Sequence, residues 1–278
     1  MKPINSYICG CTYNVEPYLE KVLINIQTLC ECFDDYYIIF SYDDSGDNTL
    51  DLLEQFMMKH PNKMKIVQGN KELGNIRTQN IANARNKILD TIKEIKLDNF
   101  DYFIMMDMDE VNSEKMNSSV INGIIDSERN EEPLPWDSLS FNRVIYYDLW
   151  ALSIEPYTFS CNHYNNVRKV KHLMVQHVKD AMGRAILKDP INGLVSCISA
   201  FNGFAIYRTQ KFINIKYEWN VHKTLTIYPK CIIDQMSHAV CEQPMNRHDD
   251  CEHRYFHIRA SQLNNARICI SPMCLFMS

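Results

Sequence analysis

Short apolar runs alternate with segments of helical periodicity along the first hundred residues. Strand-length runs that alternate with helix-period segments are typical of strand-helix units, which build a mostly parallel sheet covered by helices. We therefore expect an α/β fold with a mostly parallel central sheet flanked by helices. The length of 278 residues suits one large domain or two fused halves.

The apolar runs predict strands at residues 6–12, 36–42, 63–68 and 102–106. Apolar residues at helical spacing predict helices at 15–29, from residue 50 onward and at 77–97, with Pro17 in the first turn of the first helix. After residue 112 the alternation fades: 116–127 fits one helix, and 136–153 fits a strand followed by an aromatic loop or helix. The segment EEPLPW at 131–136 is the best candidate for a boundary, so we expect two halves, 1–115 and 116–278, of one globular domain.

The charge balance argues against a nucleic-acid partner. The formal net charge is -5, so polyanions meet no general attraction, and nucleic-acid binding would need a local basic patch. The only candidate is 166–179, which we interpret as a solvated basic face. We therefore expect no nucleic acid among the partners.

The cysteine pattern and the hydropathy indicate the cellular compartment of the chain. The eleven cysteines include no Cys-x-x-Cys pair, so neither a zinc ribbon nor a regular disulfide framework is indicated, and most should be reduced core residues. No window approaches a charge-free membrane-spanning length, and the N-terminus lacks the pattern of a signal peptide. We expect a soluble, cytoplasmic protein without a membrane anchor; for a viral chain this means the host cytoplasm or the virion.

The stretch DYFIMMDMDE at 101–110 is an apolar run that ends on acidic residues. Asp107 and Asp109 are two positions apart, so on an extended segment their side chains point to the same side. Two such carboxylates repel each other unless a cation or a proton lies between them, and Mg2+ and Mn2+ prefer oxygen ligands. The pair therefore suggests a metal site, although a solvated strand end has the same sequence.

A second acidic turn, DDSGDNT, follows the strand at 36–42. Asp43 or Asp44 can accept hydrogen bonds from a nucleobase or a ribose, as acidic residues after strands do in nucleotide-binding folds. The alternative is a capped turn, with Ser45 or Asp47 at a helix N-terminus. We expect both, with Asp44 at the ligand and Asp47 at the cap.

Positive charge should reach this edge from the helix predicted at 77–97. Ligands bind outside the carboxyl ends of parallel strands, so the segments 10–14, 43–49 and 107–110 should converge there. A guanidinium of Arg77 or Arg85 near the helix start can hold a diphosphate or a carboxylate through two hydrogen bonds. The alternative is that both arginines lie on a solvated helix surface.

The segments CTYNVEPYLEKVL, SYDDSGDNT, RTQNIANARNKIL and YFIMMDMDE resemble, in this order, nucleotide-sugar glycosyltransferases of the Rossmann-like GT-A fold, in which the acidic strand end is the DxD motif. The resemblance covers about the first 115 residues. YYDLWAL, AFNGFAIY and DCEHRYFH are similar to segments of capsule-associated mannosyltransferases and of glycosyltransferases of large DNA viruses. The resemblance implies a nucleotide-sugar-binding half at 1–115 and an acceptor-binding half at 116–278.

The resemblance also implies roles for individual residues. Mn2+ or Mg2+ would bridge the diphosphate of a UDP-sugar or GDP-sugar, and the acceptor would be a hydroxyl of a glycan or glycoprotein. A histidine near the C-terminus often adds a metal ligand in this family, and an acid near it can be the general base of an inverting reaction. The residues concerned are Asp107, Asp109, His253 and His257 for the metal, Thr12, Asn14, Asp43, Asp44, Arg77 and Arg85 for the donor, and Glu252 or Asp250 for the base.

Four further predictions fall in the second half. Trp136 and Trp150 are plausible walls of an acceptor site because aromatic faces pack against sugar rings, whereas Tyr146, Tyr147 and Leu149 are expected in the core. Asp148 lies inside an aromatic run and needs a partner or a ligand. Asn202 and Gly203 indicate a hairpin turn or a close backbone approach to the donor sugar.

The predicted function is therefore metal-dependent glycosyl transfer. A sugar-phosphate nucleotidyltransferase is the nearest alternative among enzymes, but it usually carries a Gly-rich basic loop after its first strand, which GCTYNVEPY lacks. The alternative from another class is a catalytically silent glycan-binding or virion structural protein.

Overall fold

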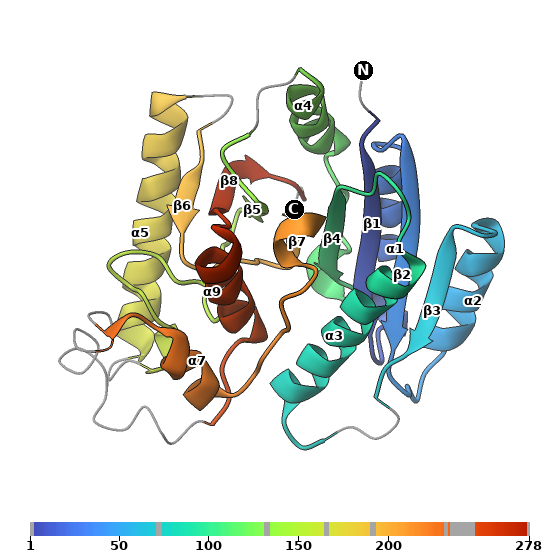
Figure 1. Cartoon of the computed structure of the whole chain (residues 1–278), viewed down its shortest axis with the longest axis horizontal. Helices are drawn as coiled ribbons and strands as arrows, with labels where there is room; N and C mark the ends of the chain where they lie inside the picture. Colours follow the sequence, from blue (N-terminus) through green and yellow to red (C-terminus); the bar gives the residue numbers. More distant parts are fainter. Residues whose placement is uncertain are drawn as a thin grey trace.

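The computed structural model describes residues 3–70, 74–130, 134–163, 167–189, 193–230, 233 and 248–276 (Figure 1). The first half follows the predicted alternation of strands and helices. Its elements are β1 (Asn5–Thr12), α1 (Glu16–Cys30), β2 (Asp35–Tyr42), α2 (Thr49–Lys59), β3 (Met64–Gln68), α3 (Arg77–Ile95), β4 (Tyr102–Asp107), the short helix η1 (Glu110–Asn112) and α4 (Ser118–Arg129).

The second half adds strands to the same sheet. Its described elements are β5 (Ser138–Asn142), η2 (Cys161–His163), α5 (Val167–Lys188), β6 (Val195–Cys197), β7 (Phe204–Arg208), α6 (Thr209–Phe212), α7 (Val221–Ile227), α9 (Glu252–Asn264) and β8 (Ile268–Cys274). The segment that follows β5 up to residue 153 forms no helix, so the loop alternative holds there. Part of the predicted boundary, residues 131–133, lies outside the described residues.

One sheet of eight strands runs through both halves, in the order β3-β2-β1-β4-β7-β5-β8-β6. Strands β3, β2, β1 and β4 pair in parallel, β7 runs antiparallel between β4 and β5, and β8 pairs in parallel with β5. Helices cover both faces of the sheet (Figure 1). The prediction of an α/β fold with a mostly parallel central sheet flanked by helices is confirmed.

The amphipathic helices divide between the two faces. Leu19 of α1, Leu53 of α2 and Ile121 of α4 share one core cluster, whereas Ile88 of α3 and Phe256 of α9 belong to another. The central strands β1 and β4 are buried along nearly their whole length, which explains why their sequences are continuous apolar runs. Pro17 lies in the first turn of α1, as predicted.

Parallel pairing brings the predicted strand ends to one edge. Cys11 is the register partner of Asp107, and Thr12 is the partner of Tyr42. The turns that follow β1, β2 and β4 therefore leave the sheet side by side, which confirms the expected convergence at the carboxyl edge.

Two other sequence expectations can be compared with the structure. The nine cysteines that the structure describes are free thiols, six of them buried. Within the described ranges, no helix has the length and hydropathy needed to cross a membrane.

Candidate functional site

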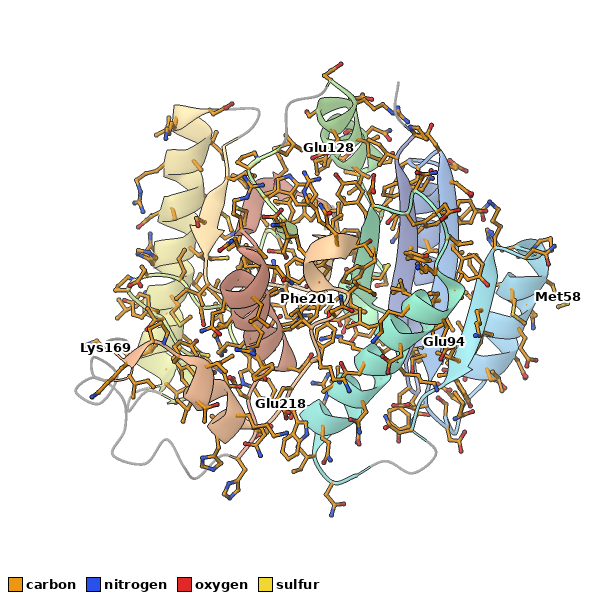
Figure 2. All side chains as sticks on the ribbon, viewed as in Figure 1. Met58, Glu94, Glu128, Lys169, Phe201 and Glu218 are labelled. Carbon is orange, nitrogen blue, oxygen red and sulfur yellow. The ribbon has the colours of Figure 1, made fainter. Side chains whose placement is uncertain are left out.

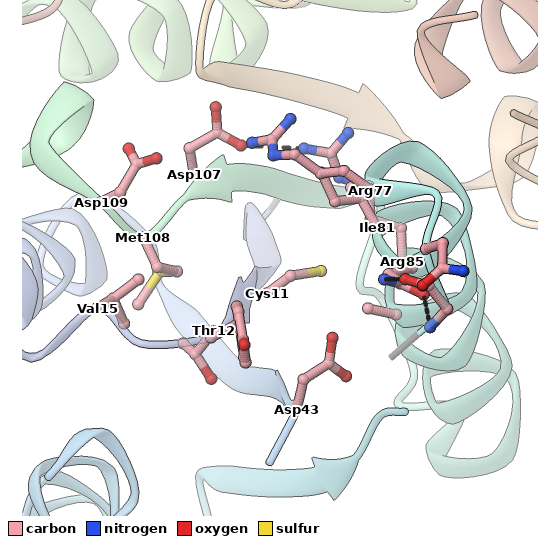
Figure 3. Close-up of a pocket in the computed structure, with 15 residues that line it drawn as sticks. Cys11, Thr12, Val15, Asp43, Arg77, Ile81, Arg85, Asp107, Met108 and Asp109 are labelled. Carbon is pink, nitrogen blue, oxygen red and sulfur yellow. Dashed lines mark hydrogen bonds and ion pairs between the residues drawn. The ribbon is translucent and has the colours of Figure 1, made fainter. Parts of the chain in front are cut away.

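A cavity of about 370 Å3 opens at the carboxyl edge of the parallel strands. It lies between the turn after β1, the end of β4 and the first half of α3 (Figure 3). The lining residues are Cys11, Thr12, Tyr13 and Val15 after β1, Asp43 after β2, Gly74, Asn75, Arg77, Asn80, Ile81, Ala84 and Arg85 on and before α3, and Asp107, Met108 and Asp109 at β4.

Asp43 is the acidic residue of the second turn that faces this cavity. The Asn70 backbone N–H donates to Asp43 Oδ1, and the Asn70 side-chain amide donates to Oδ2 at 3.1 Å. Burial raises the pKa of the Asp43 carboxyl, and the hydrogen bonds from Asn70 oppose this shift. A side chain at Gly69 would overlap the same carboxylate, so the glycine leaves room for it.

Asp44, in contrast, is exposed and does not line the cavity. Its Oδ1 accepts a hydrogen bond from the Gln68 side chain at 3.3 Å. The structure therefore favours Asp43 over the predicted Asp44 as the residue that meets a ligand. The strand ends at Tyr42 as predicted; Asp43, the next residue, is buried and held by Asn70, whereas the side chain of Asp44 turns to Gln68 at the surface.

The turn residues around the cavity hold its wall in place. Asp47 accepts hydrogen bonds from the backbone N–H of Thr49 and of Glu16, at the first residues of α2 and α1. The N-cap position of α2 is Asn48, so Asp47 binds the start of the helix from one residue before the N-cap rather than from the predicted N-cap position. Asn14 has a φ of 50° and accepts a hydrogen bond from the Gly46 N–H at 2.8 Å, so its side chain joins two turns and does not line the cavity.

Asp107 is held from two sides. Its Oδ1 accepts from Arg85 Nη2 at 3.0 Å, and its Oδ2 accepts from the Tyr147 hydroxyl at 3.1 Å. Burial raises the pKa of Asp107 to about 7, the Asp109 charge adds to the shift, and the Arg85 charge opposes it. The carboxylate therefore has a fixed orientation and a high proton affinity.

Asp109 begins the short helix η1, and its Oδ1 accepts the Val111 N–H at 3.2 Å. The segment after it is tied down by Asn112, whose amide donates to the carbonyls of Asp107 and Gly203 at 2.7 Å each. Arg143 also binds this segment, through the Val111 carbonyl and the Asn112 side chain. The second carboxylate therefore sits on a loop that is braced by residues of the other half of the chain.

The two carboxylates fit a cation that takes further ligands from a substrate. Mg2+ is usually bound through one or two carboxylates plus substrate phosphates, without a cage made wholly of protein groups. Among the described residues, no group of three or more histidines, cysteines and acids is placed to hold a metal. Asp107 and Asp109 thus offer the oxygen donor set expected for that kind of site.

Arg85 lies at the centre of a buried cluster that joins α3 to α9. Its guanidinium contacts the Glu252 carboxylate, the Nε2 atom of His253 and Asp107. It also lies over the Phe201 ring, 4.7 Å from the ring centre. Arg85 is 4% exposed, so it is not a surface arginine; its charge is balanced by two acids.

The two histidines predicted as metal ligands, His253 and His257, both have protein partners in the structure. His253 Nε2 faces the Arg85 guanidinium, and its ring stacks on Phe201 with centroids 3.8 Å apart. The two ring nitrogens of His257 contact the Ser199 and Tyr207 hydroxyls at 2.9 and 3.1 Å. Burial lowers the pKa of both histidines, that of His257 to about 3, and both side chains are buried, so their role as metal ligands stays a prediction.

The two acids predicted as a general base, Asp250 and Glu252, have different arginine partners. Asp250 is fully buried and accepts from Arg254 Nε at 2.9 Å, so it forms an ion pair with the first turn of α9 and does not line the cavity. Glu252, in the first turn of α9, contacts Arg85 Nη1, whereas Asp107 accepts from Arg85 Nη2. Only Glu252 is therefore brought to the acidic cluster.

Asp148 finds its partners in the backbone. Its carboxylate accepts from the N–H of Ala151 at 3.1 Å and of Asn202 at 3.3 Å. Asn202 and Gly203, with φ of 56° and 85°, form a turn that leads into β7, and the Gly203 carbonyl accepts the Asp107 N–H at 2.9 Å. The close backbone approach at Gly203 is therefore to the Asp107 segment, and neither turn residue lines the cavity.

Trp136 is not an acceptor wall. It is 1% exposed and packs against Tyr102, the first residue of β4, at the end of the sheet opposite Asp107. Trp150 is partly buried and packs in the core cluster of α3 and α9. Trp136 is thus a core residue at the edge of the sheet opposite the cavity. The acceptor role of Trp150 stays a prediction.

The sequence is similar to that of a known protein over about a third of the chain. No family model matches it. Over 100 residues the chain is 30% identical to the dTDP-rhamnosyl transferase RfbG of Shigella flexneri, a match that covers 36% of this chain and 31% of that protein. The chain thus spans about a third of the length of this curated relative.

Solved structures give wider but more distant matches. S. aureus TarS has a TM-score of 0.48 at 13% identity, over 98% of this chain and 36% of that one. A mannosyltransferase from Pyrobaculum calidifontis, in complex with GDP-Man and Mn2+, has a TM-score of 0.36 at 16% identity, over 67% of this chain and 53% of that one.

Proposed function

We propose that this chain is a metal-dependent glycosyltransferase of the GT-A type, which moves a sugar from a nucleoside-diphosphate sugar to a hydroxyl of a glycan or protein. The observation that carries the proposal is the cavity at the carboxyl edge, where Asp43 lies on one wall and Asp107 and Asp109 on another, and which Arg77 of α3 also lines. The sequence likeness to a dTDP-rhamnosyl transferase supports it.

The nucleoside would occupy the end of the cavity near β1 and β2. Asp43 is held by Asn70 and can accept a hydrogen bond from an N–H of the base or from a ribose hydroxyl. Thr12 and Tyr13 form the neighbouring wall, and Tyr13 is 47% exposed, which leaves its ring available to a base. Asp43 takes the role that the sequence suggested for Asp44.

The diphosphate would lie between Arg77 and the β4 acids. Arg77 is exposed at the first residue of α3 and can bind phosphate oxygens. Asp109, with Asp107 beside it, would hold Mn2+ or Mg2+, and the bound cation stabilises the charge that develops on the leaving diphosphate. Arg85 and Tyr147 keep the Asp107 carboxylate in one orientation.

The acceptor would approach from the second half of the chain, next to Tyr147, Asp148 and Trp150. If the reaction inverts the anomeric centre, a group must take the proton of the acceptor hydroxyl, and Glu252 stays the predicted one, because its partner Arg85 also contacts Asp107. Its side chain is 4% exposed and outside the cavity lining, so this role requires the acceptor to reach it from the second half of the chain. In a retaining reaction Glu252 keeps only its charge pairing with Arg85.

The test is release of nucleoside diphosphate from a panel of UDP-, GDP- and dTDP-sugars with Mn2+. We expect slow hydrolysis of one donor, lost on chelation and in Asp109→Ala. Glu110→Ala is the matched control, because Glu110 is an exposed acid next to Asp109 and outside the cavity lining, and it should retain the activity. If no donor is hydrolysed and none raises the melting temperature, the silent binding-protein alternative is favoured.

A further inference from the structure

Arg143 lies where the two halves of the chain meet at the candidate site. It directly follows β5, which pairs with β7 and β8, and Lys179 of α5 donates to the Asn142 side chain at 2.7 Å and to the Arg143 carbonyl. The guanidinium lies over the Phe276 ring, with Cζ 4.7 Å from the ring centre. Both the backbone and the charged group of Arg143 are therefore held in place.

The guanidinium of Arg143 donates hydrogen bonds to two separate segments. Nη1 donates to the Val111 carbonyl at 2.7 Å, and Nη2 contacts the Asn112 side-chain oxygen, both in η1. Nε donates to the Asn202 carbonyl at 3.1 Å, in the turn that leads into β7. One side chain of the second half thus joins the segment after Asp109 to the turn before β7.

Asn112 transmits this constraint to the end of β4. Its side-chain oxygen is bound by Arg143, which orients its amide group. That amide group donates to the carbonyls of Asp107 and Gly203 at 2.7 Å each. The segment from Asp107 to Asn112, which carries the Asp109 carboxylate, is therefore held at both of its ends.

We propose that Arg143 is a positioning residue for the cation site, which holds the 107–112 segment so that the Asp109 carboxylate stays beside Asp107. This role rests on the proposed function, because it concerns the cation that the two carboxylates would hold. Arg143 does not line the cavity, so it acts through the segment and not through contact with the donor. Removal of a group that orients metal ligands through hydrogen bonds typically lowers metal affinity by about 10–100-fold.

Electrostatics alone predicts the opposite effect of removing Arg143. Burial lowers the pKa of its guanidinium, and the charges of Asp107 and Asp109 oppose this shift, so the positive charge lies close enough to act on both carboxylates. A positive charge near a cation site repels the cation. Loss of the charge should therefore tighten cation binding, whereas loss of the hydrogen bonds should weaken it, and the sign of the change separates the two effects.

The test is titration of the purified chain with Mn2+, in which free Mn2+ is measured from its electron paramagnetic resonance signal. R143M should weaken the Mn2+ affinity ~10-fold or more. R143K keeps the charge but replaces the planar fork by a single ammonium group, which cannot bind both segments, so its affinity should fall as well. The titration gives the number of sites and the dissociation constant separately, so partial unfolding of a variant lowers only the number of sites.

The matched control is R208M, which removes an arginine with a similar set of contacts from the opposite edge of the sheet. Arg208 donates to the Trp136 carbonyl at 3.1 Å and to the Tyr102 hydroxyl at 2.8 Å, and it pairs with Glu128. Glu128 lies near the top of the view in Figure 2, whereas Phe201, which packs on the buried cluster of the site, lies near its centre. R208M should lower the free energy of unfolding and leave the dissociation constant for Mn2+ unchanged.

Wild-type or tighter Mn2+ affinity in R143M or in R143K would overturn the positioning role and leave the proposed function intact. An equal weakening in R208M would overturn it too, because the effect would then follow from a general loss of stability. If the wild type binds no Mn2+, the cation site of the proposed function fails, and the role of Arg143 fails with it.

Discussion

Replacement of Arg85 by methionine should destabilise the protein strongly, because the guanidinium is the only described cation within 4 Å of the Glu252 and Asp107 carboxylates. Methionine keeps much of the side-chain volume and removes the charge. The Glu252 side chain is 5% exposed and the Asp107 side chain is 28% exposed, so neither carboxylate is well solvated when its partner is lost. Breaking a buried ion pair from one side typically costs about 3–5 kcal/mol, and we expect a loss of that size in the free energy of unfolding.

The loss should depend on pH in a defined direction. The pKa of Asp107 is raised to about 7 in the folded protein, so between pH ~4 and pH ~7 the folded state holds a proton that the unfolded chain releases. This group therefore lowers stability as the pH rises through that window. Without Arg85 the pKa of Asp107 rises further, so the penalty of Arg85→Met should be larger at pH ~8 than at pH ~5.5, where the carboxyl is neutral.

The assay is urea unfolding of the wild type, of Arg85→Met and of Arg85→Lys, followed by tryptophan fluorescence at both pH values. Arg85→Lys keeps a charge and should lose less. The double variant R85M/E252Q removes the buried charge that was left unpaired, and it should recover ~1–3 kcal/mol relative to R85M. A loss below ~1 kcal/mol, or a double variant that is less stable than R85M, would refute the assignment of Arg85 as the charge that balances this cluster.

Three further predictions, with four variants, follow from the site and the core. Tyr147→Phe removes the hydrogen bond to Asp107 Oδ2 from a side chain that is 41% exposed, so the free energy of unfolding should change by less than ~1 kcal/mol. The value of kcat/KM for the donor should fall several-fold, and unchanged kinetics would show that this hydrogen bond has no role in the reaction. Asp43→Asn should raise the donor KM ~10-fold with little change in kcat, whereas Asp44→Asn should change neither constant. If Asp44→Asn has the larger effect on KM, Asp44 is the residue that binds the donor. Trp136→Ala should lower the free energy of unfolding by ~3–5 kcal/mol in a denaturant titration, since the side chain is 1% exposed, and a surface role predicts almost no loss.

The fold of the first half could be predicted because its signals are local. The apolar runs that became β1, β2 and β4 are buried on both faces, so they lack polar alternation and are easily recognised. Parallel pairing then requires their carboxyl ends to share an edge. The convergence of Thr12, Asp43 and Asp107 follows from this topology without knowledge of any side-chain contact.

The sequence is least informative where a role depends on the direction of a side chain. Asp43 and Asp44 are adjacent in a turn, and the contact of Asp43 with Asn70, which the sequence does not indicate, decides which of them faces the cavity. His253 and His257 are spaced for one helix face, as assumed, but that face of α9 points to Phe201, Tyr207 and Arg85 rather than to Asp109. The four-residue spacing of the two histidines determines that they share a face of α9. Only tertiary packing determines which residues that face contacts.

Some site residues gave no signal in the sequence. Tyr147 was expected in the core, but its hydroxyl reaches Asp107 across the sheet edge. Arg143 and Asn112 brace the Asp109 segment through contacts 31 residues apart in the chain. Such contacts depend on the antiparallel insertion of β7 between β4 and β5, which no periodicity near these residues indicates.

The most direct test of the proposed donor site is the equilibrium binding of UDP, GDP and dTDP, measured by isothermal titration calorimetry with and without Mn2+. We predict that at least one nucleotide binds in a Mn2+-dependent manner, and that Asp109→Asn weakens this binding by ~10-fold or more, because a carboxylate that holds the cation is lost. Failure of all three nucleotides to bind, or binding that is equal without Mn2+ and in Asp109→Asn, would contradict a metal-bridged diphosphate at the end of β4.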